Sequence, residues 1–140
     1  MQYWDTSAIV PLVVAEPASA RVRSWASRDA AIVTWAWTRV EVVSALERRA
    51  RDGHLVPAQR REALARFGQL FDAWDEVTDL LAVRTRAIQF LARHTLRAAD
   101  AAQLAAALLV SEDDPASITF VCLDGRLAEA AEREGFSVVA

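Results

Sequence analysis

Short apolar runs alternate along this chain with longer stretches whose apolar residues recur at helical spacing. The runs at 1–4, 30–34, 118–123 and 136–139 have the length and composition of buried strands. The run at 74–78 is too acidic for a central strand, so we expect a short edge strand or an extended link there.

Helical patterns fill the segments between these runs. We expect helices at 6–15, at 16–27 with Pro17 in the first turn, at 39–51, from Pro57 onward, and at 79–91, 97–110 and 126–134. Strands separated by helices indicate a mainly parallel sheet of four or five strands with helices on both faces. The predicted fold class is therefore α/β.

The bulk properties of the chain narrow the class of protein. A length of 140 residues predicts one domain spanning 1–140, and an apolar share of 54% favours a globular protein. The single cysteine, Cys122, cannot form an internal disulfide, and neither a secretory signal pattern nor an apolar run of about 20 residues is visible. These features predict a cytoplasmic protein.

Two aspartates follow predicted strands. Asp5 ends the first run and Asp124 ends the run at 118–123, so they would be neighbours if the two strands are adjacent. Each also has a structural explanation, because Asp5 suits a helix N-cap and Asp124 precedes Gly125 as in an ordinary turn. Thr6 and Ser7 add hydroxyls at the same corner, to orient a metal-bound water or to cap the helix.

Two further acids lie near the starts of predicted helices. Thr38 to Glu41 matches a capping box, in which the glutamate bonds back to the backbone. Asp100 shares a helical stripe with core residues such as Leu104, and a buried carboxylate needs a partner, which is either Arg97 or a cation.

Carboxylates gathered at one place cannot all stay ionised without a compensating cation. Oxygen-only sites suit Mg²⁺ or Mn²⁺, which activate water and stabilise the charge on a phosphate under attack. The net charge of −3 argues against bulk electrostatic binding of nucleic acid, but such cations let an acidic site accept RNA. The four acids together predict a metal site that hydrolyses phosphodiester bonds.

The segments that carry these acids closely resemble, in order, the four motifs of PIN-domain ribonucleases, and most of all those of VapC-type toxins of toxin–antitoxin pairs. They are DTSA at 5–8, VEVVSAL at 40–46, RAADAAQLAAA at 97–107 and DGRL at 124–127. The resemblance implies a three-layer α/β/α sandwich and an endoribonuclease that uses metal-activated water. It implies that the Mg²⁺ or Mn²⁺ ligands are Asp5, Glu41, Asp100 and Asp124. It also implies that the hydroxyls of Thr6 and Ser7 support the site.

The resemblance also implies partners. Members of the family commonly form homodimers and are held inactive by a cognate antitoxin. The early helices and residues 35–43 are candidates for its groove, where Arg39 could meet an acidic antitoxin side chain. The family usually has Thr or Ser where this chain has Cys122, and a thiol is a weaker hydrogen-bond partner than a hydroxyl.

Other functions remain open at this point. A phosphatase of the haloacid dehalogenase type would carry a second aspartate at Ser7, and a receiver domain would need a lysine, which the chain lacks. A non-catalytic PIN-like domain that binds a partner is another alternative. Trp35 and Trp37 either stack on bases or belong to the core or to an interface.

Overall fold

The computed structural model of the protein describes all residues from 1 to 140. Its five strands form one sheet in the order β3-β2-β1-β4-β5, and every neighbouring pair is parallel. The strands are β1 (Gln2–Trp4), β2 (Ile32–Trp35), β3 (Asp75–Val77), β4 (Thr119–Val121) and β5 (Ser137–Val139). The predicted α/β class is confirmed, and the acidic run at 75–77 is the edge strand beside β2.

Seven α-helices connect the strands. They are α1 (Thr6–Val13), α2 (Ser19–Ala26), α3 (Thr38–Arg51), α4 (Pro57–Ala73), α5 (Leu80–Arg93), α6 (Ala98–Val110) and α7 (Gly125–Arg133). The helix predicted at 16–27 is present, but it begins at Ser19, and Pro17 lies in a turn before it rather than in its first turn. Ser19 forms a turn there, because its Oγ accepts the Glu16 N–H at 2.9 Å and donates to the Val14 carbonyl.

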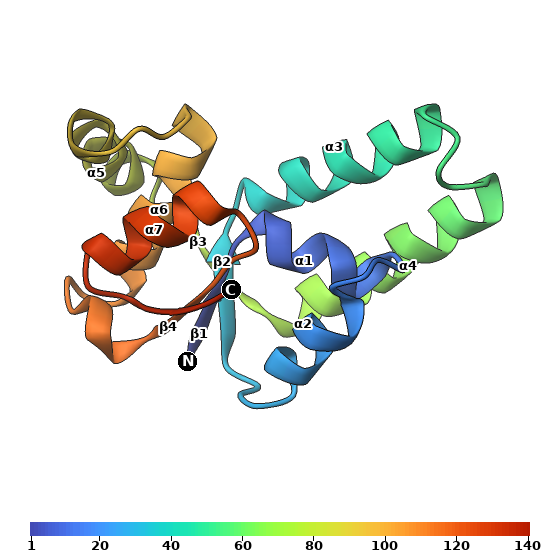
Figure 1. Ribbon diagram of the computed structural model, residues 1–140, viewed down its shortest axis with the longest axis horizontal. Helices are drawn as coiled ribbons and strands as arrows, with labels where there is room; N and C mark the ends of the chain where they lie inside the picture. The colour runs from blue at the N-terminus through green and yellow to red at the C-terminus, as the bar shows by residue number, and fades with distance from the viewer.

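The sheet separates two hydrophobic cores, as a three-layer sandwich requires. In Figure 1 helices α5, α6 and α7 cover one face and α1 to α4 cover the other. Alternation along β1 supplies both cores, since Tyr3 packs under α6 and Trp4 packs under α1 and α4. The alanine content of α6 lets that helix lie close to the sheet.

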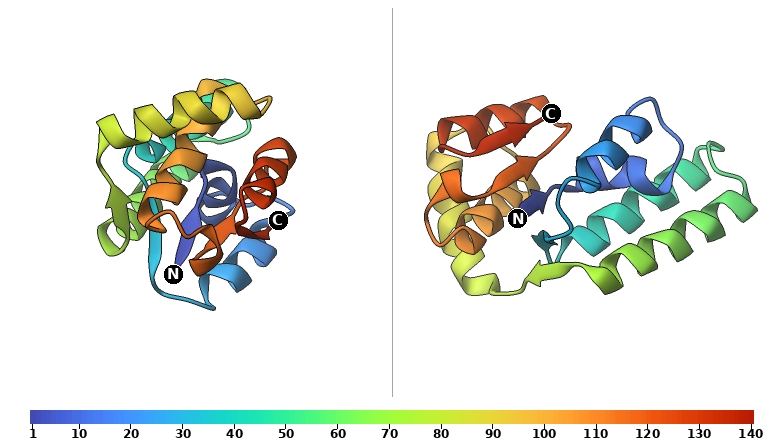
Figure 2. Two further views of the ribbon diagram at one scale, coloured as in Figure 1. Left: turned by 90° about the vertical axis from the view of Figure 1, so that its left-hand side faces the viewer. Right: turned by 90° about the horizontal axis from the view of Figure 1, so that it is seen from below.

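Helices α3 and α4 form a hairpin that extends beyond the sheet, as Figure 1 and the right-hand view of Figure 2 show. Arg60 on α4 donates three hydrogen bonds to Glu47 on α3 and links the two helices. At the base of the hairpin Arg39 donates to Glu76 at 2.7 Å and lies over the Phe71 ring. None of the seven helices combines the length and apolar character that a membrane crossing requires.

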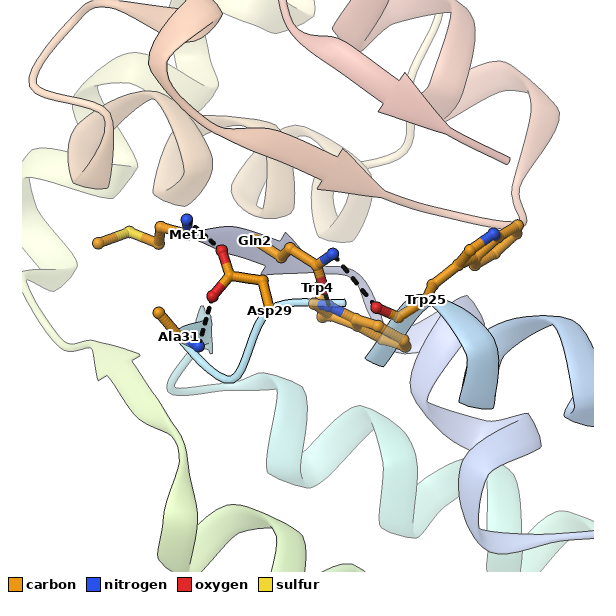
Figure 3. A network of polar contacts seen from close by, with 6 residues as sticks. All are labelled: Met1, Gln2, Trp4, Trp25, Asp29 and Ala31. Carbon is orange, nitrogen blue, oxygen red and sulfur yellow. Dashed lines mark hydrogen bonds and ion pairs between the residues drawn. The ribbon is translucent and has the colours of Figure 1, made fainter. Parts of the chain in front are cut away.

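Structural contacts close the end of the sheet where β1 begins. Figure 3 shows the N-terminal ammonium group of Met1 paired with Asp29, and Gln2 bridging Trp4 and the Trp25 carbonyl. The bond to the N-terminus is the main reason that the pKa of Asp29 is lowered. The side chains with candidate chemistry all lie at the opposite end, where the strands finish.

Candidate active site

All four acids that the sequence singled out line one open cleft of about 630 Å³. Asp5 stands between β1 and α1, and Asp124 stands between β4 and α7. Glu41 and Asp100 lie in the first turns of α3 and α6. The cleft is at the carboxyl edge of the sheet, which is where ligands bind in open α/β sheets.

Asp5 is the most deeply buried of the four, with only 4% of its surface exposed. Its Oδ2 accepts hydrogen bonds from the Ser7 backbone N–H at 3.0 Å and from Ser7 Oγ at 2.5 Å. Asp5 is therefore the N-cap of α1 as well as a member of the cleft. Burial raises the pKa of Asp5, and the nearby Asp100 carboxylate adds to the rise.

The second oxygen of Asp5 faces the cleft. Every fully buried polar side-chain atom in the protein has a hydrogen-bond partner, whereas Asp5 Oδ1 accepts no hydrogen bond. Oδ1 must therefore be exposed to solvent, and Asp5 meets solvent where it lines the cleft. One oxygen holds the side chain in place and the other is available to a ligand.

Asp124 likewise uses one carboxylate oxygen for hydrogen bonds within the protein and leaves the other free. Strands β1 and β4 are adjacent, with Trp4 paired to Val121, so the two strand-end aspartates are neighbours as expected. Asp124 Oδ1 accepts the N–H groups of Arg126 and Leu127, both at 3.0 Å, and so caps α7. Its Oδ2 accepts no hydrogen bond from the protein.

Cys122 lies between these two aspartates. Its thiol donates to Asp5 Oδ2 at 3.6 Å and accepts the Asp124 N–H at 3.2 Å. Ser7 reinforces the link, because its Oγ accepts the Leu123 N–H at 2.8 Å. Burial and the Asp5 carboxylate raise the pKa of Cys122 far above its ordinary value, so the group is a neutral thiol.

Glu41 does not form the capping box that its sequence context allowed. Its carboxylate instead accepts Thr6 Oγ1 from α1 at 3.0 Å and Gln103 Nε2 from α6 at 3.2 Å. Burial raises the pKa of Glu41, with contributions from Asp5 and Asp100, while the two hydrogen bonds lower it. Partners from other helices, rather than its own backbone, fix the direction of this side chain.

Gln103 is a site residue that sequence reasoning quoted in a motif but assigned no role. It is fully buried, and its Nε2 donates to Thr6 Oγ1 and Thr38 Oγ1 as well as to Glu41. Its Oε1 accepts the Tyr3 hydroxyl at 2.6 Å. The available signal was an amide on the buried stripe of an alanine-rich helix, three residues after an acid.

Asp100 has the partner that the structural alternative required, but the pairing is loose. Arg97 Nε lies 3.7 Å from Asp100 Oδ2, which is too long for a hydrogen bond, and the Arg97 side chain is 83% exposed. Burial and the Asp124 carboxylate raise the pKa of Asp100, whereas Arg97 lowers it. The arginine reduces the accumulated negative charge without cancelling it.

The donor set fits a hard divalent cation in its chemistry. It consists of carboxylate and hydroxyl oxygens, which Mg²⁺ and Mn²⁺ prefer. Burial, with a smaller contribution from mutual repulsion, raises the pKa of Asp5, Glu41 and Asp100. No three acidic side chains stand close enough to surround one ion as the side chains now lie. Binding would therefore require side chains of the cleft to turn toward a common point.

Comparison with known proteins identifies the family of the chain. None of the curated proteins compared with the chain matches it. The PIN domain, a nuclease-type fold, matches residues 3–133, which contain all four acids. The chain therefore belongs to the PIN domain family.

Proposed function

We propose that this protein is a Mg²⁺- or Mn²⁺-dependent endoribonuclease that acts in the cytoplasm as the toxin of a toxin–antitoxin pair. One observation carries the proposal: four carboxylates, one of them almost fully buried, line a single cleft in a PIN domain. Asp5, Glu41, Asp100 and Asp124 would hold the metal. Thr6 and Ser7 would orient Glu41 and Asp5.

The chain's own residues would prepare the cleft for hydrolysis. A bound divalent cation lowers the pKa of water and stabilises charge on a phosphate. Ser7 binds Oδ2 of Asp5 and leaves its Oδ1 free, whereas the start of α7 binds Oδ1 of Asp124 and leaves its Oδ2 free. Thr6 and Gln103 hold Glu41 at the side.

The partner side of the proposal, an antitoxin and a second copy of the chain, has weaker support. Four large apolar side chains are exposed on α5, where nothing in the chain covers them: Leu80, Leu81, Ile88 and Leu91. The idea that Arg39 meets an acidic antitoxin residue needs revision, because Glu76 already occupies its guanidinium group. A partner would have to displace Glu76 or bind elsewhere.

A non-catalytic PIN-like binding module is the second candidate. The observation that favours it is that no three carboxylates converge on one point. In such a module the acids would serve mainly as helix caps, as Asp5 and Asp124 do, and added Mg²⁺ or Mn²⁺ would not change stability.

Cleavage of a total RNA pool separates the two candidates. Wild type, Asp5→Asn and Asp72→Asn would be purified in parallel and incubated with RNA in Mg²⁺, Mn²⁺ or chelator. Asp72 is an exposed residue of α4 outside the cleft, so its variant controls for the loss of one charge. We expect discrete metal-dependent cleavage by wild type and Asp72→Asn only. Equal cleavage by all three would indicate contamination or a different site, and none by any would favour the binding module.

A further inference from the structure

Trp37 differs from the other tryptophans in its exposure. Trp4, Trp25 and Trp35 are buried and Trp74 is half-buried, whereas 60% of Trp37 is exposed. Single exposed apolar residues are common and need no explanation by themselves. Trp37, however, lines the same cleft as the four acids. The sequence left open whether Trp35 and Trp37 contact bases or belong to the core. The structure places Trp35 in the core and Trp37 in the lining of the cleft.

One face of α3 forms a wall of this cleft. Trp37, Glu41, Ser44 and Arg48 recur at steps of three and four residues, so they share one helical stripe, and all four line the cleft. At about 1.5 Å per residue, the stripe spans about 16 Å from Trp37 to Arg48. It offers, in order, an aromatic ring, a carboxylate, a hydroxyl and a guanidinium group.

Two arginines of the cleft are available to phosphates. Arg48 is exposed and makes no ion pair, and Arg97 is held only loosely by Asp100. Arg49, by contrast, is already paired with Glu16. Guanidinium groups bind phosphate oxygens with two parallel hydrogen bonds, so Arg48 and Arg97 suit the backbone of a nucleic acid in the cleft.

We propose that Trp37 stacks on an unpaired base next to the scissile phosphate, while Arg48 receives a backbone phosphate farther along α3. This inference rests on the proposed function and specifies its substrate as single-stranded RNA. A base must leave a duplex before it can lie against an aromatic ring, and proteins that bind single strands use such rings together with cationic grooves.

The character of the cleft favours RNA over a protein segment as the occupant of Trp37. Only five of its sixteen lining residues are hydrophobic, and the rest are mainly acids, arginines and hydroxyl side chains. A groove for an apolar peptide segment presents a continuous apolar floor, which is absent here. A flat base and a charged backbone match an exposed aromatic ring and a free guanidinium group on one helix face.

Abasic substitution of the RNA tests the inference directly. Wild type, Trp37→Ala and Trp37→Phe would be compared on a short unstructured RNA oligonucleotide and on a series in which each position in turn is abasic. Cleavage gives kcat/KM, and fluorescence anisotropy in an Asp100→Asn background gives the Kd without cleavage. Val56→Ala removes a similarly exposed apolar side chain outside the cleft and serves as the matched control.

We expect Trp37→Ala to weaken binding of intact RNA by about 10- to 100-fold and Trp37→Phe to recover most of the loss. On one oligonucleotide of the abasic series, the loss should disappear, because the base that stacks is already gone. Val56→Ala should match wild type throughout, and a fully paired duplex should compete poorly.

Three outcomes would overturn the inference. An equal loss on every oligonucleotide would mean that Trp37 supports structure rather than a base. If Trp37→Ala binds RNA as tightly as wild type and wild type cleaves normally, the proposed nuclease function is retained. Trp37 would then have another role, such as contact with a protein partner. Failure of wild type to bind or cleave any RNA would instead remove the proposed function itself, and the inference with it.

Discussion

Replacing Gln103 with leucine tests whether the buried network organises the site. Leucine has a similar volume but cannot form hydrogen bonds, so the substitution removes four contacts without opening a large cavity. Gln103 is the only side chain that joins Tyr3 in the sheet to Glu41 in the cleft. The variant should therefore lose stability and also release Glu41.

The size of the loss follows from the atoms left behind. The Tyr3 hydroxyl is fully buried and would lose its only acceptor, which costs about 1–3 kcal/mol. Glu41 is half-buried and keeps Thr6, so water can replace most of its lost bond. Thr38 keeps its contact with Thr34 at 3.0 Å. Together these terms predict a loss of about 2–4 kcal/mol, a large share of the about 5–15 kcal/mol of a typical domain.

Urea unfolding of four proteins measures this network: wild type, Gln103→Leu, Tyr3→Phe and the double variant. Tyr3→Phe removes the hydroxyl but leaves the buried Gln103 Oε1 without its donor, so it should also cost about 1–3 kcal/mol. The double variant should be more stable than Gln103→Leu alone, because no buried hydroxyl is left unpaired. In cleavage assays Tyr3→Phe should retain activity, whereas both proteins with leucine should lose it.

The network argument would be refuted if the double variant lost the sum of the two single losses, or more. Additive losses would mean that Tyr3 and Gln103 contribute independently. Full cleavage activity in Gln103→Leu would show that Glu41 does not depend on this donor.

Three further predictions concern single side chains of the cleft. A carboxyl whose pKa is raised by folding makes the folded protein less stable as the pH rises through that pKa. In chelator, the free energy of unfolding of Asp100→Asn should therefore increase relative to that of wild type as the pH rises above 3.8. A constant difference between the two proteins from pH 3 to 8 would contradict this. Cys122 is buried with a strongly raised pKa, so native protein should resist alkylation at pH 8 and react only in urea; rapid native labelling would contradict the geometry. Asp124→Ala should cost about 1 kcal/mol as a lost helix cap, while Asp124→Asn costs little; both should abolish cleavage, and an active Asp124→Asn would separate the aspartate from catalysis.

Local patterns predicted the fold well because they reflect backbone requirements. The apolar runs and helical stripes located the strands and helices to within a few residues. The start of α2 was misplaced, since Pro17 suggested a helix entry whereas Ser19 stabilises a turn before the helix. The pairing of β1 with β4 brings Asp5 and Asp124 together, as their positions after two strands suggested.

The contacts that orient the acids could not be predicted from local patterns, because they cross the whole chain. The capping-box pattern predicted that Glu41 bonds to its own backbone. In the structure, its carboxylate accepts hydrogen bonds from Thr6 and Gln103 instead. Gln103 looked like one polar residue in an alanine-rich helix, and only the fold shows what it contacts. Likewise, the sequence could not distinguish the buried Trp35 from the exposed Trp37.

The central claim is that these carboxylates hold a divalent cation, and a Mn²⁺ titration monitored by electron paramagnetic resonance tests it most directly. Wild type, Asp100→Asn and Asp72→Asn would be titrated, with Mg²⁺ as competitor. The account predicts that wild type and Asp72→Asn bind Mn²⁺ that Mg²⁺ displaces, and that Asp100→Asn binds it at least about tenfold more weakly, a difference of about 1.4 kcal/mol. No Mn²⁺ binding by wild type, or equal binding by all three proteins, would contradict it.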